Sequence, residues 1–215
     1  MRAVLFDFDG TLADTAPDLG GALNRMLEKR GKAPLPIEKL RPHASSGARG
    51  LLFVGFGVMP QDTDYEPMRE EFLANYSAEI CVHTRLFPGI EELLGVLESR
   101  PIVWGIVTNK AVRLTTPLVD RLGLAARAKC VVGGDSTPHL KPHPASLLHA
   151  ADKIGIKPSD CCYLGDDLRD IQAAKAAGMF SVAVEYGYSG TENGGPHGWE
   201  ADTVIGQPME LLQHL

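Results

Sequence analysis

The chain has 215 residues, of which 44% are hydrophobic, 22% charged and 7% aromatic. This is the composition of an ordinary globular protein with enough apolar residues for a sizeable core, which excludes extensive disorder. Its 27 acidic and 21 basic side chains give a net charge of -6, and no run of lysine and arginine stands out, which argues against a nucleic-acid partner.

The first residues and the apolar stretches predict a cytoplasmic protein without a membrane partner. No apolar stretch approaches the roughly 20 residues that a membrane-spanning helix needs, and Asp7 comes too early for the core of a signal peptide. The four cysteines include no Cys-x-x-Cys pair, and a chain of this length does not need disulfides to hold its core. We therefore expect free thiols.

Short apolar runs separated by helical patterns predict a parallel sheet. The first run, Ala3 to Phe8, ends in acidic residues and has the character of a fully buried strand. Similar runs recur along the chain, with leucines and alanines at helical spacing between most of them. The predicted fold class is α/β, a Rossmann-like parallel sheet with helices on both faces. The later runs are Ile102 to Val107, Cys130 to Val132, Cys161 to Leu164 and Phe180 to Val184.

A stretch without strand-like runs predicts a helical insertion after the first strand. Pro17 opens a helix whose apolar residues recur at helical spacing up to Gly31. We therefore predict two domains. The catalytic core consists of residues 1–14 and 81–215, and a small all-helical cap domain consists of residues 15–80.

The sharpest chemical signal is Asp7-Phe8-Asp9-Gly10-Thr11-Leu12, at the end of the first predicted strand. Side chains two positions apart in a strand point the same way, so the carboxylates of Asp7 and Asp9 are expected to share one small site. For an isolated Asp-x-Asp-Gly, two turn aspartates would be the commoner interpretation. A second acidic motif later in the chain changes that balance.

The second acidic motif is Gly165-Asp166-Asp167-Leu168-Arg169-Asp170, which lies between an apolar strand and a helix. Helix capping explains one of its aspartates. Three acids within five positions, facing a loop with two more, would repel one another without a cation. All these ligands are oxygens, which favours a hard ion, with Mg²⁺ as the default and zinc as a poor fit.

Two further motifs contain residue types that suit a phosphate group. Val107-Thr108-Asn109-Lys110 ends a predicted strand, and Thr108 can offer a hydroxyl and a backbone N–H. Lys141, before Pro142, offers a compact positive charge. Alone, a threonine at a strand end is usually a turn residue and a lone lysine is usually solvated, so both signals depend on the aspartates.

In combination and in this order, the four motifs resemble those of the haloacid-dehalogenase superfamily of phosphohydrolases over nearly the whole chain. The helical insertion is similar to that family's small cap, which makes the phosphoglycolate phosphatase type the most similar subgroup. Three segments also resemble bacterial N-acetylmuramic acid 6-phosphate phosphatases: Ser46-Gly47-Ala48-Arg49, Val82 to Phe87 and Val103 to Lys110. Family resemblance supports the reaction more strongly than either substrate.

The resemblance implies a Mg²⁺-dependent phosphatase that acts on a small phosphorylated metabolite, as a monomer or a homodimer. Asp7 would form an aspartyl-phosphate, and Asp9 would be the general acid and then the general base. Mg²⁺ would bind the Asp7 carboxylate, the Asp9 backbone carbonyl and Asp166, while Asp167 and Asp170 would hold its waters. The residues expected to fix the phosphoryl group are Thr108, Asn109 and Lys141.

Two alternative functions remain open from the sequence. A sugar phosphomutase would use the same nucleophile and the same acid and base, but would return the phosphoryl group to the sugar. A phospho-accepting switch protein also places aspartates, a threonine and a lysine at strand ends. Such a switch would have no use for an inserted cap, nor for Asp9 two residues from Asp7.

Residues near the predicted cap boundary are candidates for hinge and substrate contacts. Asp14 and Thr15 are expected to lead into a hinge, although Asp14 suits a helix N-cap equally well. Three cap residues are candidates for contacting a substrate carboxylate or sugar: Ser45, Ser46 and Arg49. For Ser46, the start of a helix is the competing interpretation.

Overall fold

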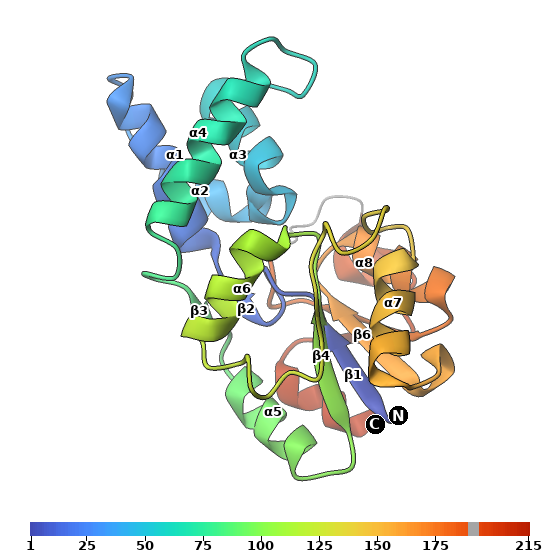
Figure 1. Ribbon diagram of the computed structural model, residues 1–215. Helices are drawn as coiled ribbons and strands as arrows, with labels where there is room; N and C mark the ends of the chain where they lie inside the picture. Colours follow the sequence, from blue (N-terminus) through green and yellow to red (C-terminus); the bar gives the residue numbers. More distant parts are fainter. Residues whose placement is uncertain (189–193) are drawn as a thin grey trace.

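Six parallel strands form the main sheet in the computed structural model, which describes residues 1–188 and 194–215 (Figure 1). The strand order is β5-β4-β1-β6-β7-β8, so the first strand of the chain lies near the middle. Ala3 pairs with Val103 on one side and with Cys161 on the other. The strands are β1 (Ala3–Phe6), β4 (Val103–Val107), β5 (Val131–Val132), β6 (Cys161–Gly165), β7 (Phe180–Val184) and β8 (Thr203–Ile205).

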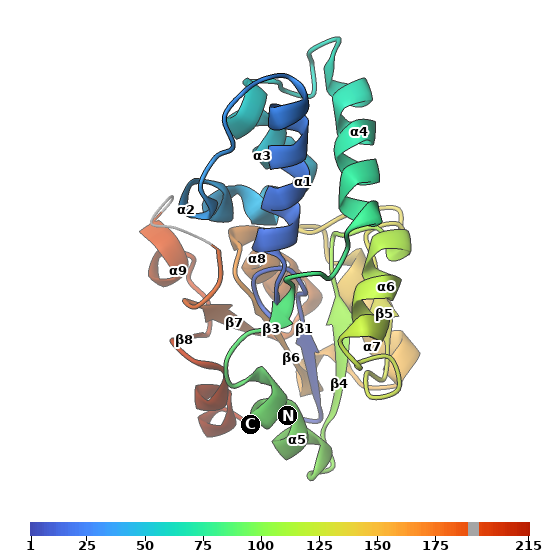
Figure 2. The same cartoon turned by 90° about the vertical axis from the view of Figure 1, so that its left-hand side faces the viewer.

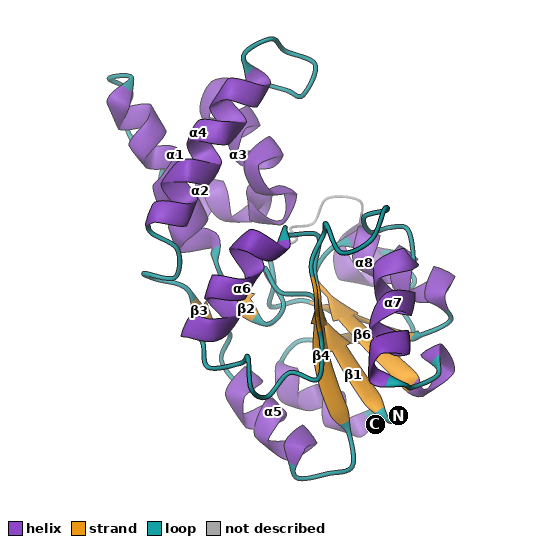
Figure 3. Cartoon of the chain, in the orientation of Figure 1, coloured by secondary structure: helices purple, strands orange, loops and turns teal. Residues whose placement is uncertain are grey.

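Helices cover both faces of this sheet, which confirms the predicted fold class (Figure 3). Because side chains alternate along a strand, Val4 and Phe6 enter one hydrophobic core while Ala3 and Leu5 enter the other. Helices α5 and α6 contribute to the first core, and α7 and α8 contribute to the second. The helices are α5 (Ile90–Glu98), α6 (Val112–Arg121), α7 (Ala145–Ile154), α8 (Leu168–Ala177) and the short α9 (Gly195–Gly198).

The predicted helical insertion is a group of helices that pack on one another above the sheet (Figure 2). We refer to residues 15–80 as the helical segment. Its elements are α1 (Ala16–Lys29), α2 (Ile37–Leu40), a 3-10 helix (Arg41–Ser46), α3 (Gly47–Phe56) and α4 (Tyr65–Ala78). In α1, four apolar residues at helical spacing are buried as the sequence predicts: Leu19, Leu23, Met26 and Leu27.

A short antiparallel pair of strands joins the helical segment to the sheet. Strands β2 (Ala13–Asp14) and β3 (Arg85–Leu86) precede and follow the segment, and Ala13 pairs with Leu86. Two-residue strands are too short to show an alternating pattern, so the sequence did not reveal them. The chain therefore leaves and re-enters the α/β part at neighbouring points.

The carboxylate of Asp18 fixes the connection after the helical segment. Asp18 is buried and accepts hydrogen bonds from the backbone N–H groups of His83 and Thr84, both at 2.9 Å, and from the Thr84 hydroxyl at 2.7 Å. We expect Asp18→Ala to lower the free energy of unfolding by about 2–4 kcal/mol, because buried donors lose a charged acceptor. Chemical denaturation measures this loss.

The matched control for Asp18 is Asp62, whose carboxylate accepts one hydrogen bond at 2.7 Å from the backbone N–H of Met59 on an exposed loop. We expect Asp62→Ala to cost less than about 1 kcal/mol, because water can replace the carboxylate there. Equal losses in the two variants would contradict the role given to Asp18.

The four cysteines carry free thiols, as predicted. Burial raises the pKa of Cys161 to about 11 and that of Cys162 to about 12, so both side chains stay protonated at neutral pH. Among the residues that the structure describes, no helix is both long enough and apolar enough to cross a membrane.

Candidate active site

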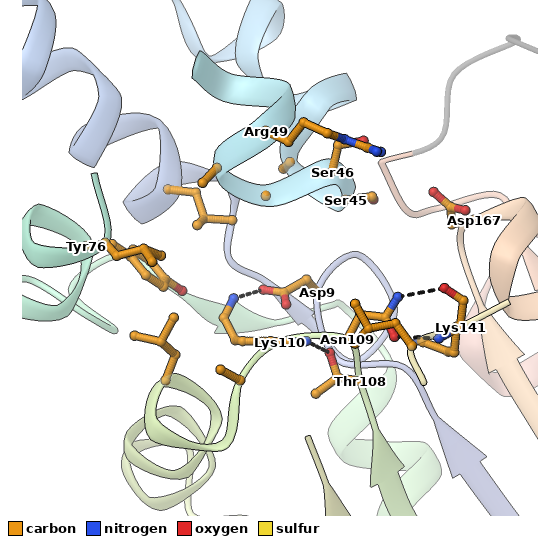
Figure 4. Close-up of a pocket in the computed structure, with 18 of the residues that line it drawn as sticks. Asp9, Ser45, Ser46, Arg49, Tyr76, Thr108, Asn109, Lys110, Lys141 and Asp167 are labelled. Atoms are coloured by element: carbon orange, nitrogen blue, oxygen red, sulfur yellow. Dashed lines mark hydrogen bonds and ion pairs between the residues drawn. The ribbon is translucent and has the colours of Figure 1, made fainter. Parts of the chain in front are cut away.

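A pocket of about 380 Å³ lies where the helical segment faces the carboxyl ends of the central strands (Figure 4). Parallel strands bring their carboxyl ends to one edge of the sheet, so motifs far apart in the chain meet there. Residues from α1, α3, α4 and α6 also line it. The predicted site residues that line the pocket are Asp7, Asp9, Thr108, Asn109, Lys141, Asp167 and Asp170.

Three aspartates form a carboxylate cluster at the base of this site. Asp7, Asp166 and Asp170 each offer an oxygen, and these oxygens lie within 4.8 Å of one another. Burial, together with the charges of Asp7 and Asp170, raises the pKa of Asp166 well above its ordinary value. Burial also raises the pKa of Asp170. When ionised, these carboxylates repel one another, and a cation bound among them would relieve that repulsion.

Hydrogen bonds and close packing hold Asp166 in place. One oxygen accepts from the Thr11 hydroxyl at 3.2 Å, and the other accepts from the Tyr188 backbone N–H and the Ser45 hydroxyl, both at 3.0 Å. Gly10 has a φ of +84°, and a Cβ there would lie 2.2 Å from Asp166 Oδ2. Glycine is thus required at this position both by backbone conformation and by space.

Lys141 brings positive charge to the same cluster. Its Nζ lies 2.9 Å from Asp7 Oδ1 and 2.6 Å from Asp170 Oδ1, and it donates a 2.7 Å hydrogen bond to the hydroxyl of Tyr163. Burial alone would lower the pKa of Lys141, but the carboxylates of Asp170 and Asp7 raise it above its ordinary value. The side chain is therefore a buried cation beside Asp7.

Asn109 positions the backbone of Lys141 through both ends of its amide. Its Oδ1 accepts from the Lys141 N–H at 2.9 Å, and its Nδ2 donates to the Lys141 carbonyl at 3.1 Å. The side chain nevertheless borders the pocket, as does that of the buried Thr108, whose Oγ1 accepts from the backbone N–H of Lys110 at 3.2 Å. Asn109 therefore connects the loop after β4 to the loop that carries Lys141.

The carboxylate of Asp9 pairs with a lysine rather than joining the three-aspartate cluster. Lys110 Nζ lies 2.5 Å from Asp9 Oδ1, and the hydroxyl of Thr15 donates to the same oxygen. Strand β1 ends at Phe6, two residues earlier than the apolar run suggests, and Asp9 lies in the turn that follows. Strand alternation therefore does not set the direction of its side chain.

Sequence reasoning missed Lys110, although it lies within a motif that was singled out. Its side chain is only 8% exposed and lies over the ring of Tyr76, at 5.0 Å from the ring centroid. The one available signal was a lysine directly after Thr108 and Asn109. A lysine at that position is usually solvated, so its burial against the helical segment cannot be read from the sequence.

Asp167 has the capping role that the sequence allowed for one aspartate. Its side chain accepts from the Arg169 backbone N–H at 2.9 Å, while the Asp170 side chain accepts from the Asp167 N–H at 3.1 Å. Burial would raise the pKa of Asp167, but hydrogen bonds from the Arg169 guanidinium lower it. That guanidinium also donates at 3.0 Å to the backbone carbonyl of Ser45 in the helical segment.

The other residues named near the cap boundary have different partners. Asp14 does not cap a helix; it forms a two-point ion pair with Arg41 at 2.8 and 2.9 Å and accepts from the hydroxyl of Tyr188 at 3.0 Å. Three residues of the helical segment that were proposed to read the substrate line the pocket: Ser45, Ser46 and Arg49.

The chain is similar to a known family over most of its length. Residues 4–184 match the family described as haloacid dehalogenase-like hydrolase. An N-acetylmuramic acid 6-phosphate phosphatase from Pseudomonas aeruginosa is 41% identical over 215 residues, which is 100% of this chain and 95% of that protein. A phosphoglycolate phosphatase from Xylella fastidiosa is 44% identical over 98% of this chain and 91% of its own length.

A solved structure is similar to the chain over its whole length. The crystal structure of a predicted phosphoglycolate phosphatase from Haemophilus somnus superposes with a TM-score of 0.86 at 25% sequence identity, covering 100% of this chain and 97% of that one. The similarity therefore extends over both the α/β part and the helical segment.

Proposed function

This chain belongs to the haloacid dehalogenase-like hydrolase family, and we propose that it is a Mg²⁺-dependent phosphatase of the phosphoglycolate phosphatase type. It hydrolyses a small phosphorylated metabolite through an aspartyl-phosphate on Asp7. The observation that carries this proposal is the position of Asp7, which lies in the carboxylate cluster, beside the cation of Lys141 and in the wall of the pocket.

The residues present fit a magnesium ion. Asp7 Oδ1 is buried and accepts no hydrogen bond of good geometry from the described residues, although the charge of Lys141 lies 2.9 Å away, so it can still take a ligand. Oxygens of Asp166 and Asp170 lie close enough to Asp7 to bind the same ion or its water molecules. The ion would be held by Asp7, Asp166 and the backbone carbonyl of Asp9. Asp170 and Asp167 would hold the water molecules bound to the ion. When bound, Mg²⁺ offsets the repulsion between these carboxylates and a phosphate monoester.

The first step of the proposed reaction transfers the phosphoryl group to Asp7. A carboxylate oxygen of Asp7 attacks phosphorus, and the bond from phosphorus to the leaving alcohol oxygen breaks. Lys141 stabilises the negative charge on the phosphoryl oxygens because it is a buried cation within 2.9 Å of the nucleophile. Thr108, in the wall of the same pocket, adds a hydroxyl and a backbone N–H to this phosphate site.

Asp9 moves the protons. It gives a proton to the leaving alkoxide and then removes one from the water that hydrolyses the aspartyl-phosphate. Lys110, whose Nζ contacts Oδ1 of Asp9, lies beside the group that carries this proton. The helical segment acts as the cap, because its residues close one side of the pocket and limit the entry of bulk water.

Phosphate release tests the proposed function. We expect the purified protein to liberate inorganic phosphate from phosphomonoesters in the presence of Mg²⁺, and to lose at least about 100-fold in rate after chelation with EDTA, with recovery when Mg²⁺ is added back. The panel includes p-nitrophenyl phosphate, 2-phosphoglycolate and N-acetylmuramic acid 6-phosphate. Full activity in EDTA would contradict the role of the metal.

Two other outcomes would replace the proposal. An isomerised sugar phosphate that forms without free phosphate would identify a phosphomutase. An aspartyl-phosphate that survives for minutes, seen as a mass increase on the intact protein, would identify a phospho-accepting switch protein.

A further inference from the structure

Tyr76, on α4 of the helical segment, has a hydroxyl without a partner. The residue is completely buried, and none of the described residues hydrogen-bonds to its hydroxyl group. Buried hydroxyls in proteins nearly always have a hydrogen-bond partner, from the protein, from water or from a ligand. Tyr76 also lines the pocket that contains Asp7 and Asp9. A molecule bound in that pocket is therefore a candidate partner for this hydroxyl.

Neighbouring side chains fix the direction of the Tyr76 ring. Phe72, one turn earlier on α4, stacks on it with the ring centroids 6.5 Å apart and the planes inclined by 14°. The ammonium group of Lys110 lies over the ring at 5.0 Å from its centroid. The ring that carries the unpartnered hydroxyl is therefore packed against both Phe72 and Lys110.

The hydroxyl of Tyr76 lies on the leaving-group side of the reaction site. Figure 4 shows Tyr76 and Lys141 at opposite ends of the labelled side chains, with Lys110 and Asp9 between them. Lys141 marks the phosphoryl end, because it contacts Asp7. Asp9 protonates the leaving oxygen in the proposed reaction, so the part of the substrate beyond that oxygen extends toward Lys110 and Tyr76.

The pocket around Tyr76 is larger than a two-carbon leaving group requires. Its volume of about 380 Å³ falls within the range of about 300–1,000 Å³ for sites that enclose whole small molecules. Apolar side chains from three helices also line the pocket: Leu19, Phe72, Leu73 and Leu114. A small acid bound at Asp7 would leave these side chains and the Tyr76 hydroxyl without contacts.

We propose that Tyr76 is a specificity-determining residue whose hydroxyl hydrogen-bonds a polar group of the leaving alcohol. It selects phosphomonoesters of sugar-sized, polyhydroxylated alcohols over those of two-carbon acids. The inference rests on the proposed function, because the same pocket has to hold the phosphoryl group at Asp7.

The variant Tyr76→Phe tests this assignment because it removes only the hydroxyl. We expect kcat/KM to fall about 10-fold or more for N-acetylmuramic acid 6-phosphate, since a site that hydrogen-bonds a substrate discriminates strongly when one partner is lost. We expect a change of less than about 2-fold for 2-phosphoglycolate, which does not reach the residue. The melting temperature should not decrease, because no hydrogen bond within the protein is lost.

Tyr186→Phe is the matched control. The Tyr186 hydroxyl is also buried and without a partner among the described residues, but Tyr186 does not line the pocket. Tyr186→Phe removes the same kind of atom, a tyrosine hydroxyl oxygen, at a position outside the pocket. We expect both substrates to be hydrolysed by this variant as by the wild-type protein.

The results separate this inference from the proposed function. If the wild-type protein releases no phosphate even from p-nitrophenyl phosphate, the proposed function itself fails. If it releases phosphate but prefers 2-phosphoglycolate, or if Tyr76→Phe changes both substrates equally or neither, the proposed function stands and the role of Tyr76 is overturned. A drop in melting temperature with equal losses on both substrates would assign the hydroxyl a structural role instead.

Discussion

Replacing Asp7 by asparagine is expected to abolish phosphate release, with a loss of about four orders of magnitude or more in kcat. The amide preserves the shape of the side chain but is not a nucleophile, so no phosphoryl group can be transferred to it. The substituted side chain would still border the pocket and leave Lys141 paired with Asp170, whose Oδ1 lies 2.6 Å away. Initial rates with p-nitrophenyl phosphate and with a sugar phosphate measure the loss.

The fold should survive Asp7→Asn. Removing the charge of Asp7 loses its ion pair with Lys141 but also removes the repulsion by which Asp7 raises the pKa of Asp166, so the two effects offset each other. We therefore expect an unchanged melting temperature without Mg²⁺ and an unchanged circular dichroism spectrum. The control is Asp64→Asn, at an exposed position without a side-chain cap bond, which should keep full activity. Near-normal turnover by Asp7→Asn would refute the nucleophile assignment.

Replacing Asp9 by asparagine is expected to have an effect that depends on the leaving group. For a sugar phosphate, kcat should fall about 10²–10⁴-fold, because an alkoxide leaves poorly without a proton donor. For p-nitrophenyl phosphate, whose phenolate leaves readily, the loss in the first step should be much smaller. Burst kinetics with the aryl substrate, measured by rapid mixing, would separate the first step from hydrolysis of the aspartyl-phosphate.

The ion pair with Lys110 provides the comparison for Asp9. In Lys110→Met the carboxylate of Asp9 remains and the hydroxyl of Thr15 still contacts it, so the proton donor is retained. This variant should not reproduce the leaving-group dependence of Asp9→Asn. Equal losses of Asp9→Asn on the aryl phosphate and the sugar phosphate would remove the general-acid role.

The sheet and the positions of the acidic motifs could be predicted because their signals are local. Buried parallel strands require continuous apolar runs, and acids directly after such runs must emerge at one edge of the sheet. Asp7 and Asp166 therefore meet although they are far apart in the chain, as the oxygen distances show. The roles given to these residues in the reaction remain predictions that the variants test.

Contacts between distant side chains could not be predicted, because nothing in a local pattern identifies the partner. Lys110 and Asp9 are 101 positions apart, and Ser45 and Asp166 are 121 positions apart. The direction of the Asp9 side chain depends on where β1 ends, and strand ends are the least certain part of a pattern-based prediction. A run of six apolar or acidic residues does not show that the strand stops at Phe6.

The pairing of Ala13 with Leu86 has a consequence for how such a protein can diversify. Strands β2 and β3, where the chain enters and leaves the helical segment, are adjacent and hydrogen-bonded. The residues between them are therefore an insertion whose length and composition do not affect the strand order of the six-stranded sheet. A lineage can thus exchange the inserted segment for one of another shape, while the strands that carry Asp7 and Asp166 keep their pairing. Substrate choice and bond-breaking chemistry are, in this architecture, separately heritable.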